Sequence, residues 1–186
     1  IVSYGLVGLT FAGPRVQYDQ TTLDNYVHAP DRAYEYKILK TQSGDGYTSF
    51  VVDLVSQTFL TKKDVNRTEW RHSLIIAKPD VIEHQTGMLI IDGGDNDGKI
   101  LSEPSDLIVE YSRATGSVVA ELGMVPNQPL TFVGEDEPRW EDALIAFTWD
   151  KYLKTGDERW PARMAMTKSA IAAMDAIQSV ILDEDG

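Results

Sequence analysis

Aromatic or aliphatic side chains recur at every second position over residues 34–39, which is the pattern of a β-strand rather than of a helix. A period of two begins at Tyr34, and a turn signal at residues 44–46 (Gly-Asp-Gly) separates this first predicted strand from a second one over residues 47–60. The short connection predicts that the two strands form an antiparallel hairpin. A third predicted strand, residues 70–77, stops before Pro79.

Residues 87–92 carry an unbroken apolar run, Met-Leu-Ile-Ile, instead of an alternation. Such a run predicts a strand that is buried on both faces, as the central strands of parallel sheets are. Residues 103–114 begin with proline and acids and are followed by Gly116, which predicts a helix. Residues 117–122 are typical of a further strand. This order of strand, helix and strand predicts a right-handed βαβ unit.

Helical periodicity dominates the last third of the chain. Apolar residues three and four positions apart predict a helix that ends at Gly156 and a second helix from Pro161 to about Leu182. Two prolines exclude regular structure from residues 123–130, which form either the wall of a site or a simple connection. Together the elements predict an α/β fold: a mixed sheet that opens with an antiparallel hairpin and continues through parallel strands, with helices packed on it.

The domain predicted from this pattern covers residues 34–186, and residues 1–33 form an N-terminal arm with one helical turn at residues 22–27. Residues 1–13 are apolar and uncharged, and they are too few to cross a bilayer. They are either the remaining end of a signal peptide or a strand or buried arm of the mature protein.

The net charge and the absence of cysteine exclude several classes of partner and site. The 186 residues include 17 basic and 29 acidic side chains, a net charge of −12, so we expect neither nucleic acid nor anionic lipid as a partner, and no membrane span. The chain has no cysteine, which excludes disulfides, thiolate nucleophiles and cysteine-based zinc sites but leaves the compartment open. Its 42% of hydrophobic residues is the content of a globular domain.

The candidate chemistry lies where the apolar strand ends, because Asp92 is followed there by paired glycines. Glycines let the main chain approach a ligand closely, and a glycine-rich loop at this place in α/β-hydrolases donates a backbone N–H to the oxyanion hole. Gly93 and Gly94 are therefore candidate oxyanion donors. The chain has no Gly-x-Ser-x-Gly elbow, so it lacks a nucleophile. Three further polar residues are expected to line the same cleft: Asn96, Asn127 and Gln128.

Neither a metal nor a cofactor is expected. The acids of residues 92–98 alternate with Gly and Asn as in a calcium loop, but they lack the EF-hand spacing and its closing Glu. The histidines at 28, 72 and 84 have no metal-ligand spacing, and His72 lies inside a predicted strand, which favours a structural role. Phosphate-binding and dinucleotide-binding glycine motifs are absent. The triplet at Asn66 (Asn-Arg-Thr) is either a chance match or an N-glycosylation site.

A resemblance to a known family rests on five segments, which are residues 22–31, 70–74, 114–130, 141–151 and 166–170. The longest of them reads Ala-Thr-Gly-Ser-Val-Val-Ala-Glu-Leu-Gly-Met-Val-Pro-Asn-Gln-Pro-Leu. Over residues 20–182 the chain resembles the PhoPQ-activated pathogenicity-related proteins. The resemblance implies a longer, secreted or envelope-associated protein that looks like an α/β-hydrolase and whose relatives include an autocrine repressor of proliferation.

The resemblance also implies that this chain is the N-terminal half of such a protein, because the family's Gly-x-Ser-type elbow would follow the last helix. We therefore expect a secreted α/β-hydrolase-like protein that hydrolyses peptide or ester bonds only when a C-terminal half or a second chain completes it. Without that part, the sheet would keep an open apolar edge. Two alternatives from other classes are a non-catalytic secreted signalling or binding protein and a structural subunit of an extracellular assembly.

Overall fold

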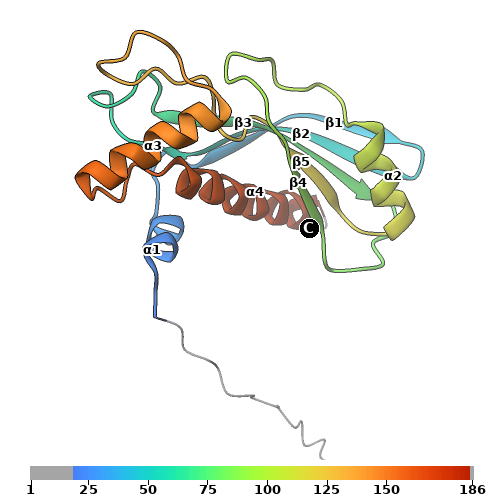
Figure 1. The fold of residues 1–186 in the computed structure, drawn as a ribbon. Coiled ribbons are helices and arrows are strands. Elements are labelled where there is room, and N and C mark those ends of the chain that lie inside the picture. The colour runs from blue at the N-terminus through green and yellow to red at the C-terminus, as the bar shows by residue number, and fades with distance from the viewer. Residues whose placement is uncertain (1–18, 185–186) are drawn as a thin grey trace, which may run out of the picture.

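The computed structural model describes residues 19–184, which form five strands and four helices (Figure 1). Residues 1–13, the segment that resembles the end of a signal peptide, lie outside the described part. The strands are β1 (Glu35–Gly44), β2 (Tyr47–Thr58), β3 (Glu69–Pro79), β4 (Met88–Ile91) and β5 (Val119–Leu122). The helices are α1 (Thr22–His28), α2 (Asp106–Thr115), α3 (Glu141–Thr155) and α4 (Ala162–Glu184).

The strands form one mixed sheet in the order β1-β2-β3-β5-β4. β1, β2 and β3 are antiparallel neighbours, and β5 pairs antiparallel with β3. β4 pairs in parallel with β5, so the unit β4-α2-β5 contains the parallel pair that the sequence predicts. The predicted fold class is confirmed as a mixed sheet that opens with an antiparallel hairpin, contains one parallel pair and carries packed helices.

The N-terminal hairpin follows from the local sequence. Gly46 has a φ of +79°, which the tight turn between β1 and β2 requires and which glycine adopts without steric cost. The pairing then runs from Gly44 opposite Tyr47 to Glu35 opposite Val55. The turn residues therefore fix the register, and with it the face of the sheet on which each side chain lies.

Helices cover both faces of the sheet, and alternate residues of β3 show which face each helix covers. Leu74 and Ile76 belong to the larger core, which packs against α4, whereas Ile75 and Ala77 contact Ile108 of α2. Figure 1 shows α4 running along the sheet and α2 near one end of it. None of the described helices is both long and apolar enough to reach across a membrane.

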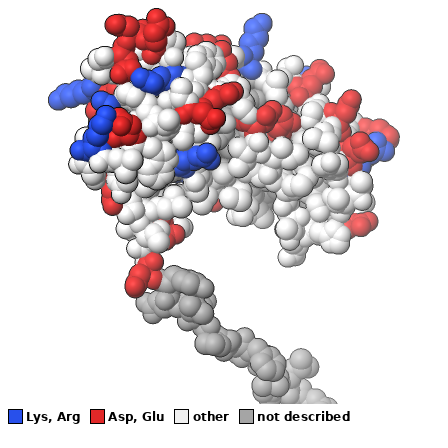
Figure 2. Space-filling view, viewed as in Figure 1, with Lys and Arg blue, Asp and Glu red and all other residues white. Residues whose placement is uncertain are grey.

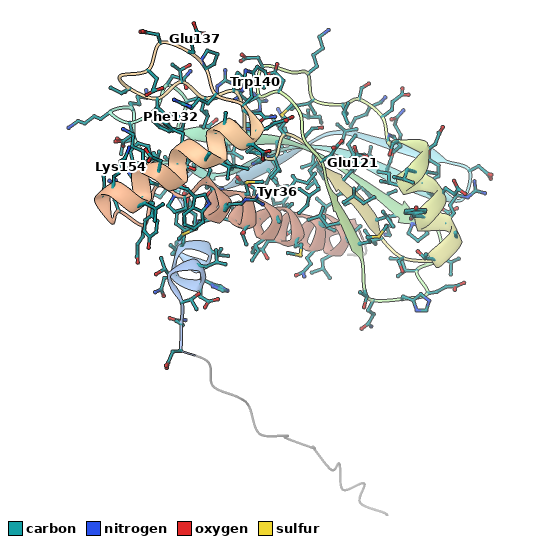
Figure 3. All side chains as sticks on the ribbon, in the orientation of Figure 1. Tyr36, Glu121, Phe132, Glu137, Trp140 and Lys154 are labelled. Atoms are coloured by element: carbon teal, nitrogen blue, oxygen red, sulfur yellow. The ribbon has the colours of Figure 1, made fainter. Side chains whose placement is uncertain are left out.

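A further core cluster joins α3 to the start of α4, at the end of the sheet away from α2 (Figure 1). Phe132, labelled in Figure 3, packs on Phe147 of α3 with ring centroids 4.4 Å apart. Trp70 and Phe59 are fully buried in the same cluster. This cluster fixes α3 beside the irregular segment that precedes it.

That segment, residues 123–130, is irregular as its prolines predict. It is nevertheless packed, since Asn127 is fully buried and Val125 and Gln128 are nearly so. A buried loop needs partners for its backbone polar groups, and the partners described below come from the neighbouring strands and loops.

The expectation that β4 is buried on both faces is wrong for this chain. Among the described strands, β4 is an edge strand with β5 on one side only. Met88 and Ile91 keep 41% and 52% of their surface exposed, while Leu89 and Ile90 are half-buried. An apolar run shows that a strand suits burial, but it does not show which segment supplies the neighbour.

Candidate functional site

Two loops meet at the carboxyl end of β4. Residues 92–98, called here the glycine loop, follow β4, and residues 123–130, called here the proline loop, follow β5. The N–H of Met124 donates to the carbonyl of Gly93 at 2.7 Å. Because β4 and β5 are parallel, both chains leave the sheet at the same edge, which is where α/β sheets bind ligands.

The two candidate oxyanion donors differ in what their amides do. The N–H of Gly93 donates to the Asp92 carboxylate at 2.8 Å, so it is already occupied. The N–H of Gly94 forms no hydrogen bond within residues 19–184. Gly94 has a φ of +127°, a backbone conformation that residues with side chains rarely adopt, so the position favours glycine. The geometry therefore favours Gly94 as the available donor.

The three residues expected to line the cleft hold the two loops in place. Asn96 Nδ2 donates to a carbonyl of the proline loop at 3.0 Å, and Asn127 Nδ2 donates to the carbonyl of Arg71 in β3. Gln128 Oε1 accepts from the N–H of Glu141 at 2.6 Å, at the start of α3. Asn127 and Gln128 are buried. The Oδ1 atoms of Asn96 and Asn127 are also buried and lack a hydrogen-bond partner in the described part of the chain.

His72 is a buried polar group in β3, as the structural role expected from the sequence requires, but the sequence did not predict its partners. His72 Nδ1 lies 3.2 Å from the carbonyl oxygen of Gly123, and its Nε2 lies 2.9 Å from Ser56 Oγ. Burial lowers the pKa of His72 to about 4, so the ring is neutral near pH 7. Ser56 is only 1% exposed, and the far ring nitrogen faces a carbonyl instead of a carboxylate, so the pair is not a catalytic one.

The sequence did contain a signal for this arrangement. In β3, His72 shares a face with Trp70 and Leu74, because residues two apart in a strand point the same way. Both neighbours are fully buried. A histidine placed between buried apolar residues needs hydrogen-bond partners inside the protein.

An apolar groove opens at the other end of β4. It has a volume of about 750 Å³ and lies between the start of β4 and the last turns of α4. The surface around α4 is largely uncharged in Figure 2, although acidic side chains are frequent elsewhere on this face. Exposed apolar surfaces of this size are candidates for interaction with another protein segment. The apolar lining includes Met88, Leu89, Ile177, Ile181 and Leu182.

The sequence of this chain matches a family described as "PhoPQ-activated pathogenicity-related protein" over residues 23–185. The chain belongs to this family. A curated relative, autocrine proliferation repressor protein A of Dictyostelium discoideum, is 35% identical over 160 residues, which are 85% of this chain and 32% of the relative. The PhoPQ-related chain thus spans about a third of that relative's length.

Two solved structures share part of their shape with the PhoPQ-related chain. A candidate acetyl xylan esterase from Bacteroides fragilis gives a TM-score of 0.47 at 9% identity, over 85% of this chain and 41% of the esterase. A glucuronoyl esterase from Solibacter usitatus gives a TM-score of 0.34 at 16% identity, over 82% of this chain and 53% of the esterase. Likenesses this distant carry no argument about the activity of the PhoPQ-related chain.

The acids of the glycine loop in this PhoPQ-related chain are engaged within the protein. Asp92 binds the N–H of Gly93, and Asp95 Oδ1 accepts from the N–H of Asp97 at 2.7 Å. Asp97 also forms an ion pair with Arg67. Across residues 19–184, no three or more His, Asp or Glu side chains gather in a way that could hold a metal ion.

The remaining candidates of the PhoPQ-related chain lie apart from the loops of β4 and β5 or on its surface. Asn66 is exposed, and its Oδ1 accepts from the N–H of Thr131 at 3.0 Å. His28 and His84 are exposed, and His28 Nδ1 lies 2.8 Å from the carbonyl oxygen of Asp24 in α1. The structure brings Gly93, Gly94, Asn96 and residues 127–128 together. It leaves His28, His84 and Asn66 outside that group, while His72 contacts the proline loop from behind.

Proposed function

We propose that this PhoPQ-related chain is the N-terminal half of a secreted α/β-hydrolase-like enzyme, which cleaves ester or peptide bonds and takes its nucleophile from a C-terminal half. The observation that carries the proposal is the free N–H of Gly94 at the end of a strand with an open outer edge. A fixed backbone N–H of this kind stabilises the oxyanion that forms when a nucleophile adds to a carbonyl.

The two edges of the sheet differ in a way that supports a further neighbour for β4. The β1 edge carries Lys37 and Lys40, and a bulge lies between Ile38 and Lys40. Lysines and bulges keep other strands away from an edge. The β4 edge is short, wholly apolar and uncharged, so it lacks these protections. An edge of this composition pairs readily with another strand.

The end of α4 supports a position for that strand. Ile181 and Leu182 line the apolar groove beside Met88, at the amino end of β4, and Figure 1 shows this end of α4 next to β4. A strand that continued from α4 would begin near Met88 and run parallel to β4. Its carboxyl end would then lie beside Gly94, where the nucleophile is needed.

In the proposed enzyme the C-terminal half supplies the nucleophile and this chain supplies the hydrogen-bond donor for the oxyanion. The nucleophile adds to the substrate carbonyl, the carbonyl oxygen gains the negative charge, and the N–H of Gly94 donates a hydrogen bond to it. One such donor lowers the barrier by about 3 kcal/mol. Gly93 supplies a second donor when the Asp92 carboxylate turns away from its N–H.

The test uses the full-length protein and a fluorophosphonate probe, which labels activated serines. The proposal predicts labelling, ester turnover, and a fall in kcat of about 100-fold for Gly94→Ala, because the substitution disturbs the backbone that carries the donor. Gly156→Ala is the matched control: Gly156 also has a positive φ, +69°, but it ends α3. Its turnover should match the wild type. A protein that the probe does not label, or equal turnover in the two variants, would reject the proposal.

A second candidate function is supported by one comparison. The curated relative is named as an autocrine proliferation repressor, and a hydrolase scaffold can serve binding without catalysis. If the protein is a non-catalytic secreted signal, the phosphonate probe should not label the full-length protein. The protein should then slow the proliferation of the cells that secrete it. Labelling of the protein by the phosphonate, together with turnover of an ester substrate, would support the enzyme and reject the non-catalytic alternative.

Secretion has an independent test at Asn66, which we propose carries an N-linked glycan. The side chain is exposed, and only its Oδ1 atom takes part in a hydrogen bond with the described residues. In a eukaryotic secretory host, endoglycosidase treatment should lower the mass of the wild-type protein and leave Asn66→Gln unchanged. A wild-type mass that the enzyme does not alter would contradict the assignment.

A further inference from the structure

A chain of hydrogen bonds behind the proline loop joins four elements of the fold. Tyr26 of α1 donates to Gln57 Oε1 in β2 at 3.0 Å, and Gln57 Nε2 donates to Ser169 Oγ in α4 at 3.1 Å. Ser169 Oγ lies 3.0 Å from Ser56 Oγ, which in turn contacts His72 of β3. Apart from Tyr26, every member is at most 1% exposed. Such a network is rigid, because each buried group depends on its neighbours for partners.

The last member, His72, is held in one tautomer. Its Nδ1 faces the carbonyl of Gly123, which only accepts, so Nδ1 carries the proton and donates. Nε2 therefore accepts from the hydroxyl of Ser56. Since burial lowers the pKa of His72 to about 4, the ring keeps this neutral form near pH 7.

Gly123 connects His72 to the glycine loop within two residues. The N–H of Gly123 donates to the carbonyl of Ser73 at 2.8 Å, and the next N–H, that of Met124, donates to the carbonyl of Gly93 at 2.7 Å. Met124 has a φ of +64°, a conformation that residues with side chains rarely adopt. Contacts on both sides must hold this turn in place, and the ring of His72 supplies one of them.

We propose that His72 is a positioning residue: by binding Gly123 it holds the Met124 turn, and through Met124 it sets the direction of the peptide between Gly93 and Gly94. The role rests on the proposed function, because that peptide carries the N–H of Gly94. His72 touches neither Gly93 nor Gly94, and the donor that it positions acts on the oxyanion, which forms only during the chemical step. We therefore expect loss of His72 to lower kcat rather than to raise KM. A misplacement of about 1 Å in such a donor costs up to ~100-fold in rate.

Two substitutions of similar size separate positioning from general stability. His72→Asn keeps an amide nitrogen near the place of Nδ1, where it can donate to Gly123. His72→Gln brings its amide near the place of Nε2, where it serves Ser56 and leaves the Gly123 carbonyl without its donor. Both remove the ring. In the full-length protein, hydrogen exchange of the Met124 amide is measured together with kcat and KM for p-nitrophenyl acetate.

The proposal predicts that His72→Asn keeps the exchange rate of the Met124 amide near the wild-type value, whereas His72→Gln raises it by about 10-fold or more. His72→Gln should also lower kcat by about 10-fold at unchanged KM. If either variant fails to fold, Ser56→Ala replaces it and should leave the Met124 amide as protected as in the wild type.

Equal exchange in the Asn and Gln variants, or loss of protection in Ser56→Ala, overturns the role of His72. The exchange measurement needs no catalysis. A wild-type protein without turnover therefore rejects the proposed hydrolase, while the exchange pattern still decides whether His72 holds the turn.

Discussion

His72 links the stability of the fold to pH at the scale of a single residue. Burial lowers its pKa from 6.5 to about 4. In the unfolded chain the ring binds a proton near pH 6.5, and in the folded chain it does so only near pH 4. The unfolded state therefore binds more protons between these two values, and the free energy of unfolding falls as the pH decreases through that window.

We expect His72 alone to lower the free energy of unfolding by about 3 kcal/mol as the pH falls through this window. His72→Asn cannot titrate, so its stability should lack this part of the decrease. Urea unfolding of both proteins across the window measures the difference. Curves that stay parallel for the wild type and the variant would contradict the burial of a neutral ring.

The two loop glycines show how far sequence reasoning reaches at this scale. Gly93 and Gly94 are adjacent and chemically identical, so the sequence predicts a donor at the pair and cannot choose between them. The choice depends on the Asp92 side chain, which occupies one amide, and on Met124, which approaches from a distant segment. A side-chain rotamer and a contact between distant segments cannot be predicted from the neighbouring residues in the sequence.

At the scale of elements, the β1-β2 hairpin and the edge strand β4 differ in how well the local sequence predicts their place in the sheet. The β1-β2 hairpin has its two strands and its turn within one stretch of sequence, so the local pattern predicts the hairpin, although not the bulge between Ile38 and Lys40. The sequence of β4 shows an apolar strand, but no neighbour in the sheet can be identified from adjacent residues. Its apolar run predicts a central strand, but in this chain the strand lies at the sheet edge. We infer that its second neighbour comes from polypeptide beyond the described residues.

A charge on the β4 edge tests that inference. Ile91 is 52% exposed in this chain, and a covering strand would bury it. In the full-length protein, Ile91→Lys should therefore lower the free energy of unfolding by about 2 kcal/mol or more. Ile38→Lys is the matched control, since Ile38 lies on the protected β1 edge and is 40% exposed. Its effect should stay within about 0.5 kcal/mol. Equal effects in urea unfolding would mean that β4 has no covering strand.

At the scale of the whole molecule, the proposed function makes this chain one part of a site that a further part completes. In that proposal Gly94 donates to the oxyanion and His72 supports it through Gly123, while Asn127 and Gln128 hold the loops by hydrogen bonds to backbone groups. The sequence resemblance predicted the family correctly, and the pattern of elements predicted a mixed sheet with packed helices. The sequence could not predict the substrate, because the amide side chains expected to line the cleft form hydrogen bonds with backbone groups of the proline loop, β3 and α3.

The most direct test of the account is the structure of the full-length protein with a phosphonate bound to its nucleophile. We predict a strand paired in parallel with β4, and a phosphonyl oxygen about 3 Å from the nitrogen of Gly94. A β4 edge without a paired strand, or a phosphonate bound away from Gly94, would contradict the account.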